Sequence, residues 1–252
     1  MRIFFRNLRR KLNSNSLVKK YLFYSIGEVL LVMVGILLAL QVNNWNEERK
    51  LIREGKRYIQ DIYQDLSKDR DNLQRIMDRL NEQYNTSAWV LDIHGSPPED
   101  ELDTIEYTKN LLMSSFPFVV HRADNTYDDL KSSGKREVVR DDELITLLNE
   151  FYFLYDLRIS NFNELPKTAR YEHRRILSQY QNIDDWRYEI AHQKKSNNYF
   201  QTVLKKPELY ELLMEIHISS HYNISFFRDL KVNAESILEF IKDRHHNILT
   251  TD

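Results

Sequence analysis

Residues 21–46 read YLFYSIGEVLLVMVGILLALQVNNWN, and the only charged side chain among them is Glu28. A helix needs about 20 consecutive apolar residues to cross the hydrocarbon core of a bilayer, and residues 22–42 have that length. Aromatic residues stand at both ends, as they do at membrane–water interfaces. The stretch predicts a transmembrane helix over residues 21–45. Its predicted boundary residues are Tyr21, Tyr24, Asn43, Asn44 and Trp45.

Two other interpretations of this stretch are open. Its longest uninterrupted apolar part, residues 29–40, is short enough for a buried helix of a water-soluble protein. It also has the length of the apolar region of a signal peptide. Cleavage is disfavoured because Gln41, Asn43 and Asn44 follow, where a cleavage site needs small residues.

The segment before the predicted helix is strongly basic. Residues 1–20 carry seven Arg and Lys residues and no acid, together with an apolar stripe. Such a segment is typical of a short amphipathic helix on the inner leaflet. Because basic residues accumulate on the cytoplasmic side, we expect a cytoplasmic N-terminus and a large domain on the other side.

Glu28 shares one face of the predicted helix with small residues. At 100° per residue, Gly35 and Ala39 flank the direction of Glu28, and Val32 lies near the same line. Small residues four apart let two helix backbones approach closely. A carboxylate inside the bilayer costs a few kcal/mol unless it is paired, protonated or hydrated. We therefore expect this face to form a homo-oligomer. The alternatives are a shallow Glu28 that reaches the cytoplasmic interface, or an ion or proton pathway with Glu28 at its axis.

Composition points to an all-α domain after the membrane segment. The 252 residues include only five glycines and five prolines, which favours long helices over a β-sandwich or a Gly-rich phosphate-binding fold. The absence of cysteine excludes disulfides, thiol catalysis and Cys-type zinc sites. A net charge of −2 predicts no general attraction to nucleic acid.

Helical periodicity predicts an antiparallel bundle over residues 46–242. Apolar residues recur every seven positions from Ile52 to Leu80, so a helix should continue from the membrane to about residue 91. A dimeric coiled coil is the alternative, weakened by Gly55, Asp69 and Gln83 in the seam. A further helix is predicted over residues 99–116, followed by a short helix that Gly134 ends. Asp141 or Asp142 is predicted to cap the next helix, which continues past Pro166 to Leu177. The last predicted helix has Pro207 at its first position. Residues 243–252 are predicted to be a polar tail.

Two further groups of residues are candidates for function. Tyr127, Leu130, Ser133 and Gly134 form a predicted turn that could meet a partner, with a helix end packed on the core as the alternative. His217 and His221 have the i, i+4 spacing that two imidazole metal ligands need, but no third ligand is evident. No Ser-His-Asp order, P-loop or dinucleotide fingerprint is present. We predict no metal and no cofactor.

Two stretches of the sequence, residues 21–47 and residues 125–156, together resemble an uncharacterised family of single-pass membrane proteins from Bacteroidota. The family has one sequence pattern in its membrane segment and a second in its outer domain. The second is similar to residues 125–156 of this chain, NTYDDLKSSGKREVVRDDELITLLNEFYFLYD. Ser25 stands where the family more often has alanine. The residues that match its first pattern are Tyr21, Ile26, Gly27, Glu28, Leu31, Val32, Gly35, Ile36, Leu38, Ala39, Leu40, Gln41, Asn43, Asn44, Trp45, Asn46 and Glu47.

The resemblance implies a bacterial inner membrane and a periplasmic helical domain, but no activity. We therefore expect a non-enzymatic interaction, sensing or scaffold protein that oligomerises through its membrane helix. Its expected partners are the lipid bilayer, further copies of itself and an unidentified membrane or periplasmic protein. A metal-dependent enzyme that uses His217 and His221 is the alternative.

Overall fold

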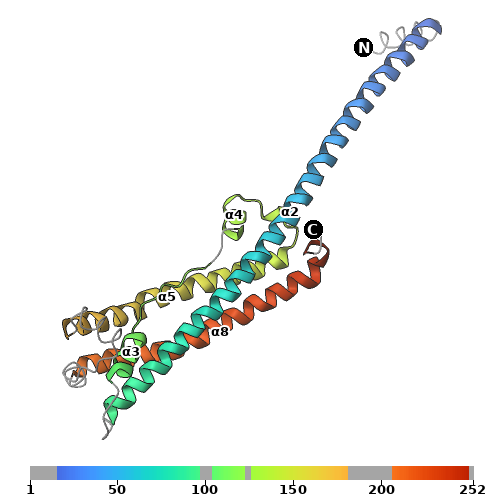
Figure 1. Cartoon of the computed structure of the whole chain (residues 1–252). Coiled ribbons are helices and arrows are strands. Elements are labelled where there is room, and N and C mark those ends of the chain that lie inside the picture. Colours follow the sequence, from blue (N-terminus) through green and yellow to red (C-terminus); the bar gives the residue numbers. More distant parts are fainter. Residues whose placement is uncertain (1–15, 97–103, 123–125, 181–205, 250–252) are drawn as a thin grey trace, which may run out of the picture. The chain divides into compact units, whose positions relative to one another are not determined.

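The computed structural model describes residues 16–96, 104–122, 126–180 and 206–249, and these residues form helices without a strand (Figure 1). The all-α prediction is confirmed. Most of the predicted amphipathic segment 1–20 lies outside the described residues. The helices are α2 (Ser16–Gly95), α3 (Thr104–Ser114), α4 (Thr126–Ser132), α5 (Asp142–Tyr180) and α8 (Pro207–Leu249), with a 3₁₀ turn at Arg136–Val138.

The chain divides into two compact units, Met1–Gly55 and Lys56–Asp252. The first contains the apolar part of α2, which is long and apolar enough to cross a membrane. Its most apolar 18-residue window has a mean hydropathy of 2.3, and none of that window is buried within the chain. This exposure argues against a buried helix of a water-soluble core. In the second unit the apolar core starts at Ile59, whereas Ile52, in the first unit, is exposed.

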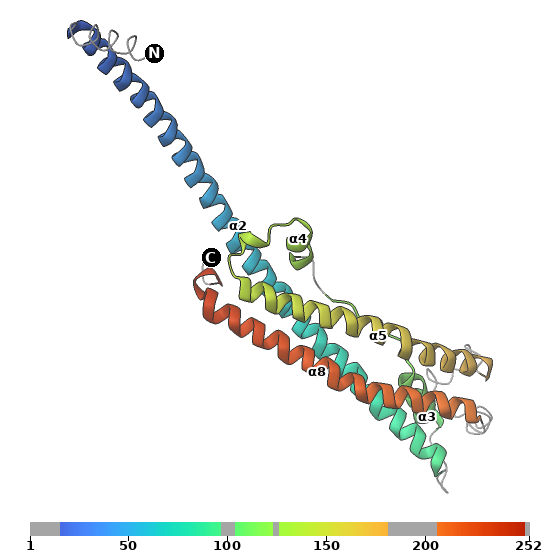
Figure 2. The same cartoon turned by 180° about the vertical axis from the view of Figure 1, so that it is seen from behind.

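The second unit is a bundle of three long helices: residues 56–95 of α2, together with α5 and α8. Both views show α5 and α8 side by side (Figures 1 and 2). The α2 residues of the predicted seven-residue seam pack into one apolar cluster with α5 and α8. The seam is thus covered within the chain, which disfavours a dimeric coiled coil through it. Its buried members on α2 are Ile59, Ile62, Leu66, Leu73, Ile76 and Leu80.

Polar residues in the seam find polar partners on α5. Asp69 is fully buried, and the Tyr152 hydroxyl donates to its Oδ2 at 3.4 Å. Gln83, which is 3% exposed, contacts Arg170. Buried polar groups are costly unless hydrogen-bonded, so these pairs fix which turn of α2 faces which turn of α5.

The predicted helix ends are found where their chemistry requires them. α4 ends before Gly134, whose φ of 69° is the left-handed conformation that glycine adopts without steric cost. Pro207 is the first residue of α8, as predicted, and α5 runs through Pro166 to Tyr180.

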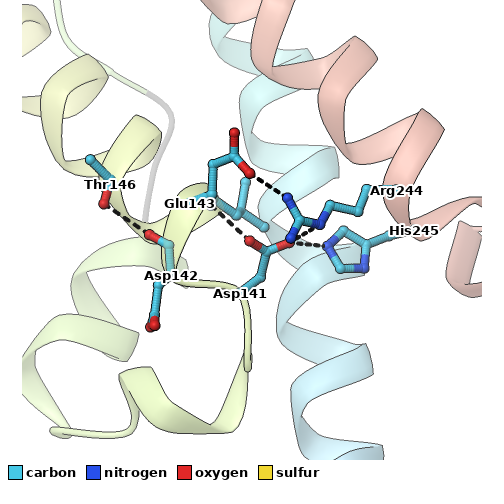
Figure 3. Close-up of polar contacts among 7 residues, drawn as sticks. Asp141, Asp142, Glu143, Thr146, Arg244 and His245 are labelled. Carbon is cyan, nitrogen blue, oxygen red and sulfur yellow. Dashed lines mark hydrogen bonds and ion pairs between the residues drawn. The ribbon is translucent and has the colours of Figure 1, made fainter.

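Asp141 caps α5 and binds the end of α8 (Figure 3). Its Oδ1 accepts a hydrogen bond from the Leu144 backbone N–H at 3.0 Å. Its Oδ2 lies 2.7 Å from His245 Nε2 and 3.3 Å from Arg244 Nε, and Arg244 also pairs with Glu143. An acid at a helix N-terminus is favoured by both the free N–H groups and the helix dipole.

These contacts explain why α8 continues to Leu249, through residues predicted to be a polar tail. The helix is kinked at His245 (φ −122°, ψ 23°), and this bend accompanies the contact with Asp141. One turn later, Gln60 Nε2 on α2 donates to the Ile248 carbonyl at 2.7 Å. Periodicity alone did not reveal these contacts, because they join residues far apart in sequence.

Substituting Gly134 by alanine should lower the free energy of unfolding by about 1 kcal/mol, because an L-residue is strained at positive φ. An added Cβ would meet no atom within 4 Å, so backbone strain is the only expected cost. Gly95→Ala is the matched control, since its Cβ also meets no atom and its φ is not positive. Chemical denaturation of both variants measures the effect. Equal stability of the two variants would contradict the assignment.

Asp141→Ala should lower the free energy of unfolding by about 1–3 kcal/mol, because it removes both a helix cap and a partner of two basic side chains. Asp141→Asn keeps a side-chain oxygen that can cap α5, so its free energy of unfolding should fall by less than that of Asp141→Ala. Thermal and chemical unfolding of the two variants test this. If the free energy of unfolding falls by the same amount in both variants, the cap contributes nothing to stability.

Candidate functional site

The apolar part of α2 presents an open face. Glu28, Val32, Gly35 and Ala39 all lie on the helix and are exposed. A Cβ added at Gly35 would meet no atom within 4 Å, and within the described chain Glu28 has no hydrogen bond or ion pair. No other described residue of the chain thus occupies this face. At the predicted outer boundary, the Arg49 guanidinium lies 4.9 Å from the centre of the Trp45 ring.

The predicted partner turn is partly core. Tyr127 is 4% exposed and Leu130 is fully buried, and the Tyr127 ring stacks on Tyr152 with 4.8 Å between centroids. The Tyr127 hydroxyl donates to Asn149 Oδ1. These two residues therefore support the alternative, a helix end packed on the core. Only Ser133 and Gly134 of the group are exposed and available to a partner.

His217 and His221 both pack against one tyrosine, Tyr84. The His217 ring stacks on Tyr84 at 4.3 Å, and the His221 ring lies 5.5 Å from the same ring. His217 Nδ1 is 2.9 Å from the Ser87 hydroxyl and 3.3 Å from the Tyr84 carbonyl, and burial lowers the pKa of His217. Across the described residues, no group of three His, Cys, Asp or Glu side chains is placed to hold a metal. The contacts of this pair favour a packing role.

The most unusual site in the bundle was not predicted. The bundle contains two apolar clusters. One includes Leu73 and Phe227, and the other includes Val90 and Leu213. Buried polar side chains lie at the level between them, and we call these six residues the polar layer. Its members are Gln83 and Ser87 on α2, Ser115 after α3, Arg170 and His173 on α5, and Ser220 on α8.

Arg170 is the cation of this layer and is only 1% exposed. Its Nε and Nη2 donate to Gln83 Oε1 at 3.1 and 2.9 Å. Gln83 Nε2 in turn donates to the Phe116 carbonyl at 2.6 Å, which ties the segment after α3 to α2. The guanidinium lies 4.9 Å from the Phe162 ring centre and 5.4 Å from that of Phe118. Burial lowers the pKa of Arg170 to about 10, so the group is still charged at neutral pH.

His173 lies one turn after Arg170 and is completely buried. Neither of its ring nitrogens has a hydrogen-bond partner among the described residues. Burial, and to a smaller extent the charges of Arg174 and His94, lowers its pKa to about 3. His94 itself bonds the Tyr107 hydroxyl at 2.8 Å, and burial lowers its pKa as well. His173 is therefore neutral in the folded protein.

A sequence signal for this layer does exist. Gln83 interrupts the seven-residue seam of α2, and His173 falls on the buried stripe of α5 defined by Phe162, Ala169 and Ile176. A polar residue on an apolar stripe marks a buried polar contact. What the sequence does not contain is the pairing of Gln83 with Arg170.

The free energy of unfolding should fall as the pH is lowered from about 6.5 toward 3, because His173 takes up a proton only when the chain unfolds. At pH values above the ordinary histidine pKa of about 6.5, the stability contributed by the neutral His173 is fully present. Between pH 7 and pH 5 we expect a loss of about 1–2 kcal/mol that His173→Phe abolishes. Urea denaturation at several pH values measures it.

The control for this prediction is His246→Gln, because His246 is exposed at the far end of α8. This variant should keep the acid-dependent loss of the parent chain. An unchanged pH dependence in His173→Phe would show that other groups cause it.

The comparisons with known proteins add a family and no activity. The chain is similar to a family of unknown function (DUF6090) over residues 28–165. The matched region begins at Glu28, includes Gln83, and ends before Arg170 and His173. No curated protein matches the chain. No solved structure matches it either.

Proposed function

This chain belongs to the family of unknown function DUF6090, and we propose that it is a membrane-anchored interaction or sensing module that assembles through the apolar part of α2. The family match covers more than half of the chain and begins within that apolar part. The observation that carries the proposal is that every large apolar side chain from Tyr21 to Trp45 is exposed.

Energetics support a lipid environment for this segment. Burying one large aliphatic or aromatic side chain stabilises a protein by about 1.5–3 kcal/mol relative to leaving it in water. None of the most apolar 18-residue window is buried by the chain itself. A continuous apolar surface of this kind is characteristic of a membrane or protein contact. Its length matches a single crossing.

Within a bilayer, the face of Glu28, Gly35 and Ala39 is the one that gains from a second helix. Lipid tails cannot pair a carboxylate, whereas a neighbouring helix can hydrogen-bond it or share its proton. Gly35 leaves open space for close approach. We therefore propose a homo-oligomer with Glu28 inside the helix–helix interface.

The proposed topology follows from the charges beside the segment. Seven basic residues and no acid precede it within residues 1–20, and this charge bias supports an N-terminus in the cytoplasm and a bundle in the periplasm of a bacterial inner membrane. The bundle then acts as a binding or sensing domain without catalysis, and its partner is a membrane or periplasmic protein.

Single cysteines test the interface directly, because the chain has none of its own. In native membranes under mild oxidation, Ala39→Cys should form a disulfide-linked dimer. Leu37→Cys is the matched control, since it lies about 180° from Glu28 around the helix and should stay monomeric. In detergent, Glu28→Ala should reduce the mass of the solubilised oligomer.

Two results would contradict the proposed interface. One is equal crosslinking of the Ala39 and Leu37 positions, which would indicate random collision in the membrane. The other is an unchanged detergent-solubilised mass for Glu28→Ala combined with no dimer from Ala39→Cys. Either would leave the anchor without an assembly role.

A further inference from the structure

Five polar atoms at or beside the polar layer are buried and have no hydrogen-bond partner in the described chain. They belong to four side chains and are Ser115 Oγ, His173 Nδ1, His173 Nε2, Arg174 Nη1 and Ser220 Oγ. An unsatisfied buried donor or acceptor costs about 1–3 kcal/mol, and native proteins leave few of them. Their concentration at one level of the bundle indicates that a bound group satisfies them.

Two of these side chains lie on the same face of α5 as Arg170. Arg170, His173 and Arg174 lie within about 100° of arc on α5, so they share a face of that helix. The Arg174 guanidinium lies 5.5 Å from the centre of the Phe116 ring, and Arg170 is tied to the Phe116 carbonyl through Gln83. Ser115 is the neighbour of Phe116 in the chain. Two guanidinium groups and an imidazole therefore share one face of α5, and both guanidinium groups are linked to the segment that follows Ser115.

The charge at this place is positive, and the described residues supply no counter-charge. Within the described chain, the polar partner of Arg170 is the neutral Gln83 amide, and no carboxylate forms an ion pair with Arg170 or Arg174. The nearest acid in sequence, Glu172, is bound to Arg175 at 2.8 and 2.5 Å. A buried cation that lacks a counter-ion is unfavourable even when neutral groups hydrogen-bond it, so a group bound here should be an anion.

We propose that the polar layer binds one small oxyanion, a carboxylate or a phosphate, between the guanidinium groups of Arg170 and Arg174. Planar guanidinium groups bind such oxygens with two parallel hydrogen bonds. The Ser115 hydroxyl and one nitrogen of His173 supply further donors. Gln83 positions Arg170 and does not itself contact the anion. This site is independent of the assembly face on the apolar part of α2.

The site predicts a ligand-dependent stability of the full chain in detergent. At pH 7 and constant ionic strength, replacing chloride by inorganic phosphate or by acetate should raise the melting temperature in a saturable way, because a ligand that binds only the folded state stabilises it. The anion that acts at the lower concentration identifies the class, phosphate or carboxylate.

Arg170→Met should raise the anion concentration that gives half of the increase in melting temperature by about ten- to hundredfold, since a charge-assisted hydrogen bond to the anion is lost. In chloride alone this variant should be less stable than the parent chain, because the buried Gln83 Oε1 loses both of its hydrogen-bond donors. Arg175→Met is the matched control. Arg175 is exposed and paired with Glu172, so its replacement should leave the anion response intact.

Ser115→Ala provides a second variant that changes no charge. It should weaken the response several-fold while the bundle stays folded. A melting temperature that is the same in phosphate, acetate and chloride overturns the proposal and indicates that water alone satisfies the layer. An anion response of the same size in Arg170→Met and in the parent chain also overturns it, because the anion then binds elsewhere.

Discussion

The apolar surface of α2 between Tyr21 and Trp45 is the constraint on which this molecule depends. These residues are helical and exposed, and the chain offers no cover for the apolar window they contain. Water is a poor environment for them, since each large side chain left exposed forgoes about 1.5–3 kcal/mol of burial free energy. The helix therefore requires lipid or another helix around it, and this requirement links the sequence to the proposed anchoring.

The bundle of the second unit has a different organisation. Its two apolar clusters supply the gross stability, whereas the polar contacts between them determine which turns face each other. The Gln83–Arg170 contact joins α2 to α5, and Asp141 joins α5 to the end of α8. Buried polar pairs of this kind add little net stability but make alternative registers costly, because a shifted helix would leave them unpaired.

The fold could be predicted from sequence to the level of elements. The apolar segment, the scarcity of glycine and proline, and the seven-residue period from Ile52 to Leu80 were sufficient for an all-α chain with one long first helix. Local chemistry located the left-handed Gly134, the Asp141 cap and the start of α8 at Pro207. Each of these signals depends on residues within a few positions of one another.

What could not be predicted depends on contacts between distant residues. The burial of Tyr127 and Leu130, the stacking of Tyr84 on His217 and the Arg170–Gln83 pair all need the register of the helices, which a single sequence does not contain. Likewise, α8 continues past residue 242 because Arg244 and His245 meet an acid more than a hundred positions away.

Accessibility of single cysteines along α2, measured in intact membranes, tests the central claim most directly. The account predicts that cysteines placed at Leu31, Gly35 and Leu38 do not react with a polar, membrane-impermeant maleimide until the membrane is dissolved, while a cysteine at exposed Lys56 reacts from the outer side. Reaction at all four positions before solubilisation would show that water surrounds the apolar segment, and the anchoring would then be wrong.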